Sequence, residues 1–146
     1  MTKLIIDSAD LLFAVEENND MAESYIDRQS GEVLRISLYE EMEEEAELKA
    51  RIEATPERYL FIPPVSSGEA WQVMEDFIET VGNEKFAARL TRAIHGRGAF
   101  RAFKDALCDQ PDERERWFRF KDEQNLKELR DWLKAEGIET TLHVKR

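Results

Sequence analysis

Residues 71–81 read WQVMEDFIETV, and this stretch decides what kind of fold the chain has. Its apolar residues recur at steps of three and four, which is the period of one face of an α-helix. They are Trp71, Met74, Phe77, Ile78 and Val81. Ser66 and Ser67 stand before the stretch as candidate N-caps. The sequence therefore predicts a helix here.

The same period continues toward the C-terminus. Asn83 is placed to open a second helix, and Gly96 stands where a helix end favours a left-handed residue. A third helix is predicted between Gly98 and Pro111, and a fourth ends at Gly137. The residues we expect to be buried on these helices are Phe86, Leu90, Ala93, Ile94, Phe100, Phe103, Leu107, Trp117 and Leu133.

The first 64 residues carry weaker and more varied signals. Ser8 is a candidate N-cap for a short helix that ends near Asn18. Two apolar runs, 25–27 and 33–37, flank Ser30-Gly31, which is typical of a β-hairpin. A glutamate-rich helix follows.

That helix is predicted over 40–53, and a further strand over 58–62 is stopped by Pro63-Pro64. Residues 138–144 alternate between apolar and polar, which predicts a terminal strand able to join the N-terminal sheet. The expected fold class is α+β, a small antiparallel sheet packed with a C-terminal helical bundle. We expect a single domain over 1–146, with an acidic α/β subregion, 1–64, and a mainly helical one, 65–146.

Composition narrows the classes of function. The 146 residues are 42% hydrophobic, enough for one core, but no apolar run approaches the roughly 20 residues of a membrane span. Cys108 is the sole cysteine, so neither an internal disulfide nor a paired-cysteine zinc site is available. We expect a cytoplasmic protein that does not bind membranes.

Charge is distributed unevenly along the chain. The net charge is −11, with 6 Lys/Arg against 20 Asp/Glu in residues 1–80 and 15 against 12 in residues 81–146. The first part therefore carries −14 and the second +3. An acidic protein repels polyanions at long range, so we expect a protein partner rather than nucleic acid.

Four segments carry a family likeness: GRGAFRAFKD at 96–105, MEDFI at 74–78, WFRF at 117–120 and DWL at 131–133. In them, and over most of its length, the chain resembles an uncharacterised bacterial protein family known only by the UPF number 0158. The resemblance implies a bacterial cytoplasmic protein and no activity. No catalytic or binding residue is carried over from it.

The sharpest candidate site is a run in which every charged residue between Glu84 and Asp105 is basic. A glycine turn inside the run leads into a helix N-terminus, where free N–H groups and the helix dipole favour an anion. The candidate anion- or partner-binding residues are Arg89, Arg92, His95, Arg97, Gly98, Arg101 and Lys104. The alternative is a structural helix hairpin whose basic face pairs with carboxylates of the same chain.

Other groupings favour structural interpretations. The glutamates at 41–47, and Glu75, Asp76 and Glu79, are typical of solvated helix faces rather than cation sites. Cys108 is expected to be a buried structural thiol. An aromatic group could stack nucleic-acid bases if exposed, but core packing is the simpler interpretation. That group is Trp117, Phe118, Phe120 and Trp132.

These patterns together predict a non-catalytic protein-binding or regulatory module. No nucleophile, base and orienting group form a recognisable set, so we assign no catalytic residue, metal or cofactor. His95 and His143 lie too far apart in sequence to suggest a pair. The alternative function is binding of a phosphate backbone or nucleotide around Arg97, and a small enzyme ranks third.

Overall fold

The computed structural model describes residues 4–16, 22–37 and 43–143, and they form two compact units. One unit comprises residues 1–65 and 128–146, and the other comprises residues 66–127. Helix α6 (Pro111–Ala135) contributes its last turns to the first unit and the rest to the second. The α+β class predicted from the sequence is confirmed. The prediction of a single domain with two contiguous subregions stays a prediction.

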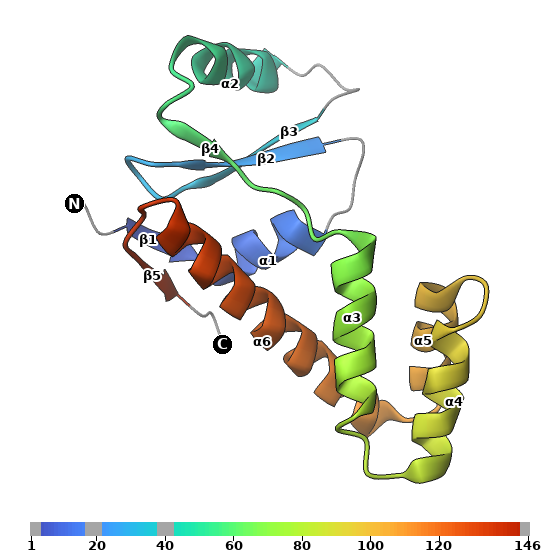
Figure 1. The fold of residues 1–146 in the computed structure, drawn as a ribbon. Coiled ribbons are helices and arrows are strands. Elements are labelled where there is room, and N and C mark those ends of the chain that lie inside the picture. Colours follow the sequence, from blue (N-terminus) through green and yellow to red (C-terminus); the bar gives the residue numbers. More distant parts are fainter. Residues whose placement is uncertain (1–3, 17–21, 38–42, 144–146) are drawn as a thin grey trace. The chain divides into compact units, whose positions relative to one another are not determined.

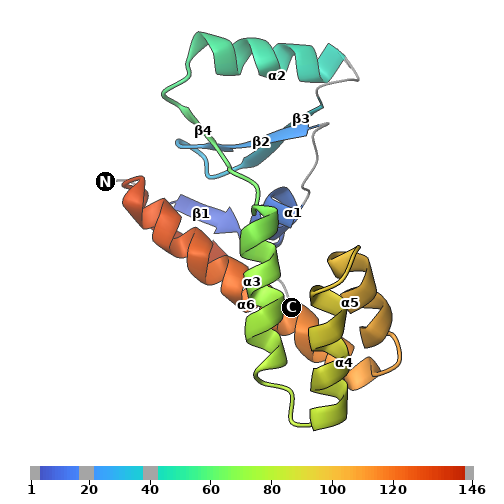
Figure 2. The same ribbon diagram turned by 45° about the vertical axis from the view of Figure 1, so that its right-hand side comes forward.

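The first unit contains the sheet built on the predicted hairpin. Strands β2 (Ala22–Asp27) and β3 (Val33–Ser37) pair antiparallel, and β4 (Tyr59–Phe61) pairs with the other edge of β2. Helices α1 (Ser8–Glu16) and α2 (Glu43–Ala54) lie on opposite faces of this sheet (Figure 1). The view in Figure 2 shows the same layering. The hairpin and the strand before Pro63 are therefore confirmed.

The terminal strand differs from the expectation. Strand β5 (Thr140–His143) does not join the hairpin sheet but pairs in parallel with β1 (Leu4–Asp7). Both edges of the central strand β2 are already occupied by β3 and β4. Leu4 and Ile6 of β1 are buried, so β1 contributes apolar side chains to the core of the first unit.

A partly buried ion pair fixes the base of the hairpin. Arg58 donates from Nε and from one terminal nitrogen to the two carboxylate oxygens of Asp27, at 3.0 and 2.8 Å. The Gln29 backbone N–H donates to the same carboxylate at 2.9 Å. Asp27 is 4% exposed, and the hydrogen bonds from Arg58 lower its pKa to about 2. The pair holds the turn of the hairpin to the start of β4.

The second unit is helical. It contains α3 (Ser67–Ile78), α4 (Glu84–Ile94), α5 (Ala99–Leu107) and the first part of α6. Ser66 and Asn83 cap α3 and α4 as predicted, because each side-chain oxygen accepts the N–H of the third residue beyond it. Aromatic edges fill the core, with Phe103 and Trp117 centroids 4.8 Å apart. Its buried residues are Met74, Phe77, Phe86, Leu90, Ile94, Phe103, Ala106, Leu107 and Trp117.

Three local expectations are corrected by the structure. Asp7, not Ser8, caps α1, because its carboxylate accepts the N–H groups of Ala9 and Asp10. The left-handed residue between α4 and α5 is Gly98, with φ of 62°, and not Gly96. Cys108 is exposed rather than buried, because the inward face of that turn is already taken by Ala106 and Leu107.

Candidate functional site

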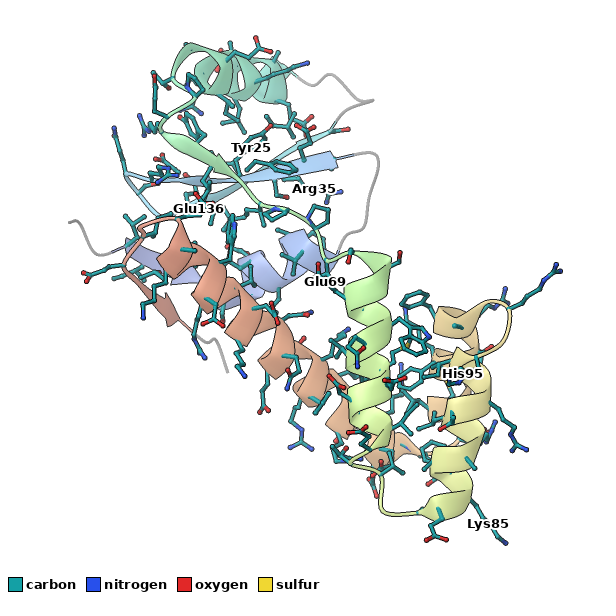
Figure 3. The ribbon with its side chains drawn as sticks, in the orientation of Figure 1. Tyr25, Arg35, Glu69, Lys85, His95 and Glu136 are labelled. Atoms are coloured by element: carbon teal, nitrogen blue, oxygen red, sulfur yellow. The ribbon has the colours of Figure 1, made fainter. Side chains whose placement is uncertain are left out.

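The candidate site is built on the hairpin of α4 and α5. Each helix turns one face into the core of the second unit, and the charged residues stand on the other face. Gly98 makes the connection possible, since φ of 62° is unfavourable for residues with a Cβ atom. Lys85, at the start of α4, points away from the helices (Figure 3).

All seven residues predicted for the site are exposed, but the structure does not give them one role. Arg89 is engaged, because its guanidinium lies 2.7 Å from the Asp109 carboxylate across the α4–α5 hairpin. Both side chains of this pair are well exposed, so the ion pair contributes little to stability. Within residues 66–127, all of which are described, the remaining basic residues of the run make no ion pair: Lys85, Arg92, Arg97, Arg101 and Lys104.

His95 serves the local structure. Its Nδ1 is 2.7 Å from the Thr91 carbonyl oxygen, and its ring stands edge-on to Trp71 with centroids 5.6 Å apart. The Trp71 indole N–H in turn donates to the Ile94 carbonyl at 2.9 Å. The end of α4 is thus closed by side chains, as helix carbonyls without an intrahelical partner require. These contacts make His95 a support for the end of α4, and Figure 3 shows it on the hairpin of α4 and α5.

The exposed side of α5 forms a compact group that we call the α5 patch. It consists of Arg97, Phe100, Arg101 and Lys104. Phe100 was expected to be buried and is 41% exposed, which corrects that prediction. Its neighbours Ala99 and Phe103 pack in the core of the unit, whereas Phe100 lies in the first turn of α5, outside that core.

The N-terminus of α5 lacks a side-chain cap. Gly98 occupies the N-cap position and has no side chain to accept a hydrogen bond. The N-cap residues of α3 and α4, by contrast, each accept one from the backbone. The first N–H groups of a helix have no intrahelical acceptor, and Gly98 itself is exposed. The predicted geometry of a glycine turn leading into a helix N-terminus is therefore present, beside Arg97 and Arg101.

The other sequence candidates do not form a site. Among the described residues no three His, Cys, Asp or Glu side chains are arranged to hold a metal ion. Gln72 donates to both Glu75 and Asp76, at 3.3 and 3.0 Å, on the surface of α3. Glu45 and Glu47 lie on α2, and Glu41 lies outside the described residues. No helix within the described ranges has the length and apolar content to cross a membrane.

The aromatic group of α6 is divided between core and surface. Trp117 is 5% exposed and Phe120 packs against the core, so neither offers a free ring face. Phe118 is 41% exposed, but Arg114 and Lys121 lie over its ring at 5.3 and 5.4 Å from the centroid. Trp117, Phe118 and Phe120 therefore do not form one stacking platform.

Comparison with known proteins gives a family without an activity. A family model described as "Uncharacterised protein family (UPF0158)" matches residues 1–144. The "UPF0158 protein PA5073" of Pseudomonas aeruginosa is 33% identical over 139 residues, covering 95% of this chain and 88% of the relative. UPF0158 proteins of Chlamydia muridarum and Chlamydia pneumoniae are 26% identical over 125 residues, 85% of this chain. The chain spans only 38% and 39% of those two proteins, and no solved structure matches it.

Proposed function

The chain belongs to the uncharacterised protein family UPF0158, and since that membership brings no activity with it, we propose that the protein is a non-catalytic binding or regulatory module. Its partner in this proposal is another protein of the bacterial cytoplasm. A cytoplasmic setting agrees with a chain whose sole cysteine, Cys108, is exposed and free.

One observation carries the proposal: the α5 patch combines three exposed cations with an exposed aromatic ring. Arg97, Arg101 and Lys104 make no ion pair within residues 66–127, although Arg89 on the neighbouring helix does. Aromatic residues and arginine, which make up three of the four residues of the patch, are enriched in protein interfaces. A surface that served only to pair with carboxylates of its own unit would show those pairs.

Affinity purification tests the proposal directly. We expect specific proteins to co-purify with the tagged chain from a nuclease-treated extract of its own bacterium, and to be lost with the double variant Arg97→Glu, Arg101→Glu. The matched control is Arg119→Glu, Lys127→Glu, two exposed residues of the same unit with the same change in net charge. Co-purification unaffected by the α5 double variant would contradict the proposal.

Binding of a phosphate backbone is the second candidate, favoured by the uncapped N-terminus of α5. Such binding releases counterions and would weaken steeply as salt rises. Fluorescence anisotropy with single- and double-stranded DNA and RNA at low salt measures it, with Arg97→Ala, Arg101→Ala as the variant. We expect negligible binding, because the chain carries a net charge of −11.

A further inference from the structure

We propose that the α5 patch binds an acidic protein segment that places an apolar side chain against Phe100. This inference rests on the proposed function and names the chemistry of its partner. The patch has the two components that such a segment requires, cations for its carboxylates and an open ring for its apolar side chain.

The cations of the patch are free to meet carboxylates. Arg101 and Lys104 are three residues apart on α5, a spacing that puts two side chains on one helix face, and Arg97 stands in the turn just before it. Hydrogen bonds between guanidinium groups and carboxylates are about twice as strong as neutral ones and have a defined geometry. Asp105 also lies on the exposed side of α5, so the binding segment must place its carboxylates toward Arg97 and Arg101.

Within the part of the chain that the structure describes, the ring of Phe100 has no cation stacked on it, unlike the equally exposed ring of Phe118. Phe118 and Phe100 are both 41% exposed. Two cations cover Phe118, whereas among the described residues no cation or aromatic ring is stacked on Phe100. Aromatic side chains are common among the residues that contribute most to binding in protein interfaces. The contacts that surround such a side chain exclude water from it.

Charge distribution favours a short acidic segment over a nucleic acid. The second unit has 11 Lys/Arg and 12 Asp/Glu, so it is nearly neutral overall, and three of its cations belong to the α5 patch. A long polyanion extends beyond the patch and meets the carboxylates around it, while a segment with a few carboxylates ends within it. The apolar contact also adds affinity that salt does not screen.

Two fluorescein-labelled peptides test the inference with the full-length protein. Both are short and composed of Asp and Glu, and one carries a central Phe where the other carries Ala. Anisotropy should show that the wild type binds the Phe peptide about tenfold more tightly than the Ala peptide. Phe100→Ala should abolish that preference, Phe100→Leu should keep part of it, and Phe118→Ala should leave it unchanged. Arg97→Glu, Arg101→Glu should remove binding of both peptides, and Arg119→Glu, Lys127→Glu should not.

Three outcomes of these binding measurements would overturn the inference. Equal affinity for the two peptides in the wild type, or a preference that survives in Phe100→Ala, would overturn the inference. So would tighter binding of single-stranded DNA than of either peptide, because that outcome assigns the patch to nucleic acid. Affinity purification separates this failure from failure of the proposed function, since a protein partner lost with Arg97→Glu, Arg101→Glu would stand whatever the peptides do. Circular dichroism and thermal unfolding of every variant confirm that each has folded.

Discussion

At the scale of single residues, Phe100 shows what periodicity can and cannot predict. It shares its direction around α5 with Leu107, and that spacing was the reason to expect burial. Leu107 is 1% exposed, while Phe100, two turns earlier, is 41% exposed, although its neighbour Ala99 packs against the core. A period gives the angle of a residue around a helix but not how much of that face the core covers. The exposed ring that anchors the proposed site was therefore missed.

At Gly31 both the backbone angle and the surrounding atoms exclude a side chain. Its φ is 81°, and a Cβ atom there would lie 2.5 Å from the Ile5 carbonyl oxygen. Gly31→Ala should lower the free energy of unfolding by about 1–2 kcal/mol through the backbone angle alone, with the overlap adding more than about 1 kcal/mol. Urea unfolding measures the change.

Gly137 supplies the control in the same unit, because its φ is 77° and a Cβ atom would meet nothing within 4 Å. Gly137→Ala should show only the cost of the backbone angle. Equal losses in the two variants would mean that the close approach between the hairpin turn and β1 is absent.

Asp27 makes stability depend on pH in a definite direction. Its pKa falls from 3.8 to about 2 on folding, because the carboxylate accepts hydrogen bonds from Arg58. A lowered pKa stabilises the fold fully above the unfolded value, and the stabilisation is lost as pH falls from about 5 toward 2. This amounts to about 2 kcal/mol at pH 7 and roughly half of that at pH 3.

Unfolding in urea at pH 7 and pH 3 tests this dependence. Asp27→Asn should be less stable than the wild type, and the difference should shrink at the lower pH. Arg58→Gln should show the same reduced pH dependence, because the carboxylate then has no guanidinium partner. A difference that is constant between pH 7 and pH 3 would contradict the assignment.

At the scale of elements, the helical core of the second unit predicts which substitutions on α5 will lower stability most. Phe103 is 1% exposed and stands edge-on to Phe77 and Trp117, with centroids 6.3 and 4.8 Å away. Phe103→Ala should cost about 3–5 kcal/mol, because it leaves a cavity that rigid neighbours cannot fill. Phe100→Ala on the same helix should cost less than about 1 kcal/mol, since its ring is 41% exposed. Chemical denaturation compares the two, and similar losses would be inconsistent with this core.

Helices were easier to predict than strand partners, for a physical reason. The apolar period of α3 and α4 can be identified from about a dozen neighbouring residues, and so can a cap such as Asn83. The pairing of β1 with β5 joins residues 4–7 to residues 140–143, and alternation identifies a strand without naming its neighbour. The terminal strand was therefore predicted, but its parallel partner was not.

At the scale of the whole molecule, the net charge could be counted from the sequence. Which charged residues form ion pairs could not be predicted from it. The basic run was visible as a string of residues, and all seven candidates proved to be exposed. Only the structure separates Arg89, which is paired with Asp109, and His95, which packs on Trp71, from the α5 patch. Those distinctions depend on partners that are 20 positions away in the chain for Arg89 and Asp109, and 24 positions away for His95 and Trp71.

The most direct test of the central claim is photo-cross-linking in living cells, with a photoreactive phenylalanine analogue at position 100 and, as the control of equal exposure, at position 118. We expect a protein adduct from position 100, identified by mass spectrometry, that is absent from position 118. The adduct should also disappear when Arg97→Glu and Arg101→Glu are added. A nucleic-acid adduct at position 100, or identical adducts at both positions, would contradict the claim that the α5 patch is a protein-binding surface.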